Sequence, residues 1–254
     1  MSYLIFSIVN KFRPKFHLFL LFSLSLTFLV SGIASAEPKV VDKVVLKALQ
    51  AKPDIEEGRS LYHNCALCHT PEGWGSSAGK YPQIAGQHQS VIIKQMADIH
   101  KGNRDNPTMM PFTVPIFVKG AQALADISAY IQQLLMVPNN SIGTGIRLDK
   151  GKALYDEHCK SCHGANGEGD AKEFYPRIQG QHFSYLLRQM QWVKMGKRRN
   201  ADPKMVEQFQ IFSQSDMAAI ADYVSRMKPD KAMLADHMDW KNPDFRPGFN
   251  TKGR

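Results

Sequence analysis

The sequence lacks several features that define other classes of protein. It has only four cysteines among 254 residues, and its 22% charged and 43% hydrophobic residues exclude a disordered chain, a collagen and a coiled coil as the main state. After residue 36 no apolar run is long enough to span a bilayer. No stretch alternates convincingly between apolar and polar residues as a strand does, and no glycine-rich phosphate loop, nucleophile triad or nucleic-acid module is present. We therefore expect a globular, helical chain with no nucleic-acid partner.

The first 36 residues have the pattern of an export signal. Three basic residues and no acidic one precede an apolar run over residues 18–30, and Ala34-Ser35-Ala36 is typical of a signal peptidase site. A run of about 13 residues is short for a membrane span, which needs about 20. The sequence therefore predicts a cleaved signal peptide over residues 1–36 and a periplasmic protein, with a retained anchor as the alternative. Without this segment the formal net charge falls from +9 to +6.

The four cysteines form two copies of Cys-x-x-Cys-His, at residues 65–69 and 159–163. This is the attachment pattern of haem c, in which two thiols bond to the vinyl groups and the histidine reaches the iron. A redox disulfide does not need the histidine, a Cys₂His zinc site lacks a fourth ligand nearby, and both pairs are too closely spaced to cross-link a fold. The sequence therefore predicts two covalently bound haem c groups, attached through Cys65 and Cys68 and through Cys159 and Cys162.

The surroundings of the two patterns repeat as well. Residues 81–88 read Tyr-Pro-Gln-Ile-Ala-Gly-Gln-His, and residues 175–182 read Tyr-Pro-Arg-Ile-Gln-Gly-Gln-His, at the same offset of 94 as the cysteines. A domain-sized period that occurs twice indicates a duplicated domain and not a solenoid. Turn residues mark the boundary between the copies. We predict a first domain over 37–136, a linker over 137–148, a second domain over 149–228 and a C-terminal extension over 229–254.

Apolar residues recur at helical spacing in both copies. The pattern predicts three pairs of helices, and Ser213 with Asp216 indicates a capping box at the start of the last one. The expected helices cover residues 55–66 and 149–160, which end at the cysteine patterns, 91–99 and 185–193, and 124–134 and 217–227. A domain of about 85 residues has a poor core of its own, so the protein without haem is expected to be largely unfolded.

These features resemble the class I cytochromes c, and the duplication over residues 53–228 resembles the di-haem cytochrome c4 family. The resemblance implies an all-α fold of two tandem cytochrome c-like domains, each around one covalently bound haem c. It implies His69 and His163 as the fifth iron ligands and a methionine before the last helix as the sixth. Met205 is the expected ligand in the second domain. In the first domain Met109 and Met110 both qualify.

The choice between the two methionines depends on how the two domains are aligned. Alignment through Ile116-Phe117 and Ile211-Phe212 places Met110, like Met205, six residues before its isoleucine. Met109 lies seven residues before, but it shares the Pro-x-Met context of Met205. We therefore expect Met110 to be the ligand and keep Met109 as the alternative. The loop after Met110 is about two residues longer than the loop after Met205.

The resemblance also implies a second layer of contacts around each haem. A carbonyl at Pro82 and at Pro176, each 13 residues after its histidine, would accept a hydrogen bond from the imidazole and orient it. Candidates for contact with the haem propionates are Tyr81, Tyr175, Gln95, Gln189, Arg104 and Arg198 or Arg199. The other histidines near the repeats, namely His63, His88, His158 and His182, are expected to be structural.

Function follows from the ligands. An iron with histidine and methionine both bound has no open position for a substrate, so it exchanges electrons. By resemblance the protein would be a non-enzymatic carrier between a quinol-oxidising complex or a dehydrogenase and a terminal oxidase or reductase. Two alternatives remain: the cytochrome subunit of a dehydrogenase complex, as in flavocytochrome sulfide dehydrogenase, and a di-haem enzyme such as thiosulfate dehydrogenase or a cytochrome c peroxidase. The mildly basic surface would favour acidic partners or peripheral contact with an anionic membrane.

Overall fold

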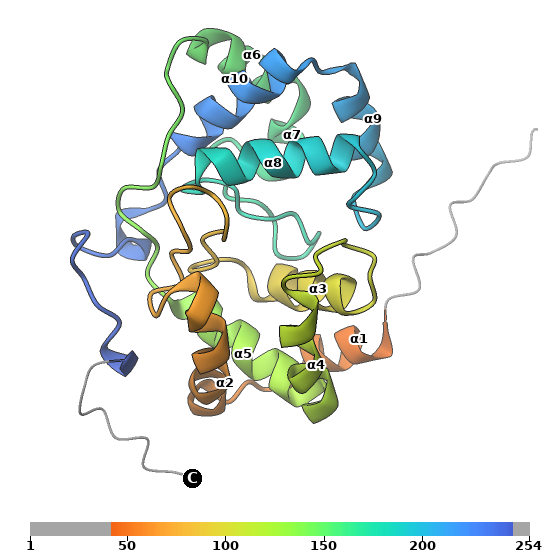
Figure 1. The fold of residues 1–254 in the computed structure, drawn as a ribbon, viewed down its shortest axis with the longest axis vertical. Helices are drawn as coiled ribbons and strands as arrows, with labels where there is room; N and C mark the ends of the chain where they lie inside the picture. The colour runs from red at the N-terminus through yellow and green to blue at the C-terminus, as the bar shows by residue number, and fades with distance from the viewer. Residues whose placement is uncertain (1–41, 246–254) are drawn as a thin grey trace, which may run out of the picture. The chain divides into compact units, whose positions relative to one another are not determined.

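The computed structural model describes residues 42–245 (Figure 1). The predicted signal peptide and the end of the predicted extension, from residue 246, lie outside the described residues. The described part of the chain contains α-helices, two 3₁₀ turns and isolated backbone bridges, but no strand, and none of its helices is long and apolar enough to cross a membrane. The helices are α1 (Lys43–Gln50), α2 (Ile55–His69), α3 (Gln89–His100), α4 (Met110–Lys119), α5 (Ala121–Gln133), α6 (Leu148–His158), α7 (Lys160–His163), α8 (Phe183–Lys194), α9 (Pro203–Ile211) and α10 (Gln214–Ser225), and the turns are η1 (Lys231–Met233) and η2 (Pro243–Phe245).

Helices α1–α5 form the first half of the molecule and α6–α10 the second, each with its own hydrophobic core. The first core forms where α2 crosses α5. A Cβ atom at Gly58 would overlap the backbone carbonyl of Asp126, so only glycine allows the two helices to approach this closely. One turn further along, Tyr62 is fully buried with its ring 5.4 Å from that of Tyr130.

The second half repeats this crossing between α6 and α10. A Cβ atom at Gly151 would overlap the carbonyl of Ala219, and the rings of Tyr155 and Tyr223 lie 5.8 Å apart. The glycine and tyrosine that recur before each cysteine pattern are therefore the residues that set the helix crossing. Helix α10 begins with the predicted capping box, in which Ser213 and Asp216 each accept from the other's backbone N–H.

Two details of the predicted helices differ from the structure. Helix α2 does not stop at the cysteine pattern but continues through it to His69, and the corresponding segment of the second half divides at Cys159 into α6 and α7. Helix α1 was not predicted at all. It begins at Asp42, whose side chain accepts from the backbone of Val44, and it buries Val45 and Ala48 against the first core. Eight residues are too few to show a helical period by themselves.

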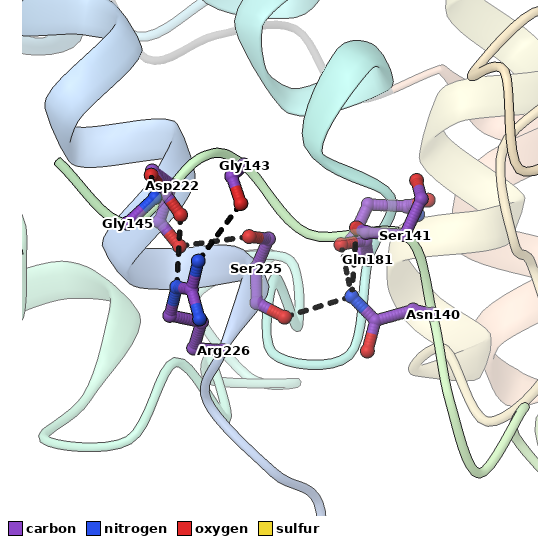
Figure 2. Close-up of polar contacts among 8 residues, drawn as sticks. All are labelled: Asn140, Ser141, Gly143, Gly145, Gln181, Asp222, Ser225 and Arg226. Atoms are coloured by element: carbon purple, nitrogen blue, oxygen red, sulfur yellow. Dashed lines mark hydrogen bonds and ion pairs between the residues drawn. The ribbon is translucent and has the colours of Figure 1, made fainter.

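The segment between α5 and α6 is fixed to the second half (Figure 2). The Asn140 side chain donates to the carbonyls of Gln181 (2.9 Å) and Ser225 (2.7 Å). Further along, the N–H of Gly145 donates to the Asp222 carboxylate at 2.6 Å, and the Arg226 side chain, itself paired with Asp222, donates to Gly143. The composition predicted a loop here, and the structure shows a loop that is held along α10 by specific bonds.

The two halves meet through contacts that repeat with the sequence. His88 Nε2 donates to the carbonyl of Glu168, and His182 Nε2 donates to that of Trp74, both at 2.8 Å. His182 lies 94 residues after His88, and Glu168 lies 94 residues after Trp74. Each half therefore makes the same contact with the other, so the halves are related locally by a two-fold axis. Arg104 and Arg198, which are also 94 residues apart, form a backbone bridge with each other and therefore lie at this axis.

The C-terminal strap, residues 229–245, returns from the second half to the first. Its backbone pairs with Met136, which donates to Met233 and accepts from Ala235. Further along, buried Asn242 donates to the carbonyl of Pro71 and to the hydroxyl of Tyr130. The strap is not part of the repeated domain. Its contacts link the end of the second half to the first half.

Candidate functional site

Each cysteine pattern ends in a buried histidine with a defined orientation. His69 is 6% exposed, and its Nδ1 donates to the carbonyl of Pro82 at 3.0 Å. His163 is 9% exposed, and its Nδ1 donates to the carbonyl of Pro176 at 3.1 Å. Burial lowers the pKa of both imidazoles, so they are neutral. Because the carbonyl fixes the proton on Nδ1, Nε2 is left as the free electron pair that can bind a metal ion.

Two glycines allow the loop after each histidine to fold back onto it. Gly75 and Gly169 have φ values of +69° and +72°, and a Cβ atom at either would overlap the backbone at the proline that the histidine contacts. These glycines were missed by the sequence analysis, although their spacing of 94 marks them as part of the repeat. They bring the proline carbonyl within reach of the imidazole.

The first cysteine of each pattern carries a buried thiol. Burial, together with the neighbouring cysteine, raises the pKa of Cys65 and of Cys159 to about 12, so both thiols stay protonated at neutral pH. Among residues 42–245 there is also no cluster of His, Cys, Asp or Glu that could hold a metal ion by itself. Thioether attachment of a cofactor is the chemistry that fits these side chains.

Two backbone hydrogen bonds of α-helical spacing align the methionines of the two halves. The N–H of Met110 donates to the carbonyl of Asn106, and the N–H of Val206 donates to that of Asp202, in each case from four residues along. Asn106 and Asp202 are therefore equivalent. By this register Met109 corresponds to Met205, and Met110 corresponds to Val206.

The buried residues of the two helices give the same register. Thr113 and Ile116 are buried in the first half, four and seven residues after Met109, as Phe209 and Phe212 are four and seven residues after Met205. This register differs from the sequence alignment through Ile116 and Ile211, since Ile116 is 5% exposed and Ile211 is 69% exposed. Met110 is itself 41% exposed, whereas Met109 is partly covered.

Several of the predicted propionate contacts meet in one cluster between α3 and α8. Arg104 donates to Gln95 and Gln189, and Arg198 donates to the same two oxygens. Arg104 also donates to the hydroxyl of Tyr185. Two cations thus share neutral acceptors, an arrangement that suits the carboxylates of a bound cofactor.

The other candidates have different surroundings. The ring of Tyr81 lies 6.4 Å from that of His69, and Tyr175 exchanges backbone hydrogen bonds with Asp170 and contacts Cys162. Arg199 is exposed and donates to the carbonyl of Gly102.

The remaining basic and histidine side chains also have structural contacts. Lys194 donates to the carbonyls of Gln210 and Phe212. His63 packs against Phe245 and His158 against Phe212. Together with the interface roles of His88 and His182, this agrees with the structural roles that we predicted for all four histidines.

Known proteins show the same organisation. The Cytochrome c family profile matches twice, at residues 55–135 and 148–228. Cytochrome c4 of Pseudomonas aeruginosa is 30% identical over 213 residues, which cover 81% of this chain and 96% of the relative. This chain belongs to the di-haem cytochrome c4 family. As a cytochrome c4 it has two tandem cytochrome c domains, binds two haem c groups and is an electron-transfer protein.

Two further comparisons concern the fold and the wider family of this cytochrome c4. The crystal structure of reduced recombinant cytochrome c4 from Pseudomonas stutzeri superimposes with a TM-score of 0.62 at 24% identity, over 70% of this chain and all of that one, and shows the same fold. A thiosulfate dehydrogenase electron acceptor of Stutzerimonas stutzeri is 29% identical over 175 residues, or 64% of this chain and 78% of the relative.

Proposed function

We propose that this cytochrome c4 is a periplasmic carrier that moves single electrons between larger redox proteins and catalyses no bond chemistry itself. The observation that carries the proposal is the matched pair of sites. In each half a buried, neutral imidazole is fixed by a proline carbonyl, and a methionine lies at or within the first turn of the helix before the last one. The predicted export signal supports the compartment.

In each site the chain supplies ligands of two kinds. We assign His69 and His163 as the ligands that follow the cysteines, and Met205 as the second side chain that would hold the iron in the second half. In the first half we assign Met109 in place of Met110, because helix register and burial both match it to Met205. Bound between such ligands, haem iron provides a one-electron couple, and the thioether raises its reduction potential.

The relative named as an electron acceptor for thiosulfate dehydrogenase favours a dehydrogenase as one partner of this protein. We propose that the protein accepts electrons from a periplasmic dehydrogenase or a quinol-oxidising complex and delivers them to a terminal oxidase or reductase. The alternative is a fixed subunit of a dehydrogenase complex. Purification from the native membrane and periplasm separates the two, because a subunit would remain bound to a larger flavin or molybdenum protein.

Carbon monoxide binding to the reduced protein tests the carrier function. Two low-spin haems at positive potentials that bind no carbon monoxide are expected, because both iron positions would be filled. One haem that binds carbon monoxide, or that has a far lower potential, would overturn the carrier function and indicate catalysis at that iron, as in a di-haem enzyme.

A further inference from the structure

Helix α4, which begins directly after Met109, has a sequence that favours a helix only weakly. Pro115 lies inside it and has no N–H to donate to the carbonyl four residues earlier. Four of its ten residues are β-branched, which lowers helix propensity further. Met109, at the N-cap position, has no side-chain oxygen that could accept from the first turn. The position of Met109 therefore depends on contacts that reach α4 from other parts of the chain.

Helix α9, which carries Met205, is built differently. Its only proline is its first residue, Pro203, where a missing N–H leaves no helical hydrogen bond unmade. The Asp202 side chain caps the helix by accepting from the N–H of Lys204 at 2.9 Å. Of the two methionines, only Met109 therefore stands before a helix that needs outside support.

His100, the last residue of α3, contacts α4 at two points. Its ring stacks on that of Phe117, with the two centroids 4.2 Å apart and the two planes 2° apart. Its Nδ1 atom lies 3.2 Å from the hydroxyl oxygen of Thr113. Thr113 and Phe117 are four residues apart and lie on the same face of α4. The imidazole of His100 therefore fixes one full turn of this helix.

The Thr113 hydroxyl extends this contact to the start of α4. It is fully buried and donates to the carbonyl of Met110 at 2.6 Å. A hydroxyl has one proton to donate, so Thr113 accepts from His100, and the Nδ1 atom of His100 is the donor. The N–H of Met110 donates in turn to the carbonyl of Asn106. The residue next to Met109 is therefore held at both its N–H and its carbonyl.

The second half cannot form the same chain of hydrogen bonds. By the helix register described above, Phe209 stands in the place of Thr113, and it has no hydroxyl. Lys194, which lies 94 residues after His100, donates instead to two carbonyls at the far end of α9. The chain of bonds from α3 to the methionine is thus particular to the first half.

We propose that His100 and Thr113 are positioning residues for Met109. Together they fix the first turn of α4, so that the sulfur of Met109 stays bound to the iron of the first haem. The inference rests on the proposed function, because it takes Met109 as an iron ligand. It adds two residues that touch neither the iron nor its ligand and that act through the backbone beside that ligand.

The test titrates the intact ferric di-haem protein with imidazole, which competes with a methionine for the sixth iron position. Binding is followed at each haem separately, from its haem methyl signals in NMR spectra. Thr113→Val keeps the shape of the side chain and removes the hydroxyl, so the imidazole affinity of the first haem should rise about tenfold. His100→Phe keeps the stack on Phe117 and removes only the donor, and it should raise that affinity about threefold. The second haem should bind imidazole as in the unaltered protein.

Thr113→Ser is the matched control. It loses the methyl group and keeps the hydroxyl, so the imidazole affinity of the first haem should stay within about twofold of the original. If Thr113→Val does not fold, His100→Phe and Thr113→Ser carry the test. Equal increases in Thr113→Val and Thr113→Ser, equal increases at both haems, or no increase in either Thr113→Val or His100→Phe would overturn the proposal.

The unaltered protein separates a failure of this inference from a failure of the proposed function. In the reduced state each haem should show the NMR methyl signal of a bound methionine. If the first haem lacks this signal, the ligand assignment and the inference that depends on it are both overturned. If the signal is present and the Thr113 and His100 variants bind imidazole as the unaltered protein does, only the positioning role is overturned.

Discussion

At the scale of single residues, the first-half methionine is the clearest test of the site. If Met109 binds the iron, Met109→Ala opens the sixth position, and the reduced first haem should become high-spin and bind carbon monoxide. Its potential should also fall, because the thioether that favours ferrous iron is gone. Met110→Ala is the matched control, since it truncates an adjacent side chain that is 41% exposed and should leave spectrum and potential intact. The opposite pattern in the two variants would restore Met110 as the ligand.

The choice between Met109 and Met110 also shows what could not be predicted from the sequence. The cysteines and histidines could be assigned because the chemistry of haem attachment fixes their spacing. The methionine could not, because it depends on which side chain of α4 faces inward, and the chain around it carries an apolar residue at almost every position. In such a helix the hydrophobic pattern does not identify the buried face. The hydrogen bond from Met110 to Asn106 identifies it instead.

At the scale of helices, the repeated glycines lead to a second prediction. Gly151→Ala places a methyl group against the backbone carbonyl of Ala219, where α6 and α10 cross. Backbone cannot move aside as a side chain can, so the two helices must separate, and the free energy of unfolding should fall by about 1–3 kcal/mol. Lys152→Ala, on the exposed face of α6, should change it by less than about 0.5 kcal/mol. Urea unfolding of the two variants measures the difference, and equal stabilities would show that the crossing adjusts without cost.

The helix pairs were predictable because they repeat, and two appearances of one pattern strengthen a weak periodic signal. The structural elements that occur only once in the chain were not predicted. Helix α1 has no counterpart after the linker, and the contacts of the strap depend on surfaces that exist only in the folded first half, such as the carbonyl of Pro71 and the hydroxyl of Tyr130. The sequence could mark residues 229–254 as additional to the repeat, but it could not show where they bind.

At the scale of the whole molecule, the interface between the halves should respond to pH through His182. This imidazole is 3% exposed, its Nε2 donates to Trp74, and its Nδ1 accepts from the N–H of Ser141 at 3.2 Å. Only the neutral ring can make both contacts. Burial accordingly lowers its pKa below the usual value of 6.5. A histidine with a lowered pKa in the folded state stabilises the protein fully above pH 6.5, and this contribution is lost as the pH falls through the folded-state pKa.

His182→Gln separates this effect from other acid-sensitive groups. Glutamine can replace one of the two contacts, so at pH 8 the variant should be less stable by about 1 kcal/mol. Below pH 6.5 the unfolded chain binds a proton at His182 more readily than the folded protein does, so the unaltered protein loses stability, whereas the glutamine of the variant does not titrate. The difference in unfolding free energy between the two proteins should therefore shrink and can change sign. The measurement is the free energy of unfolding of both proteins from pH 8 to pH 5. Parallel pH profiles would show that His182 does not control the acid response.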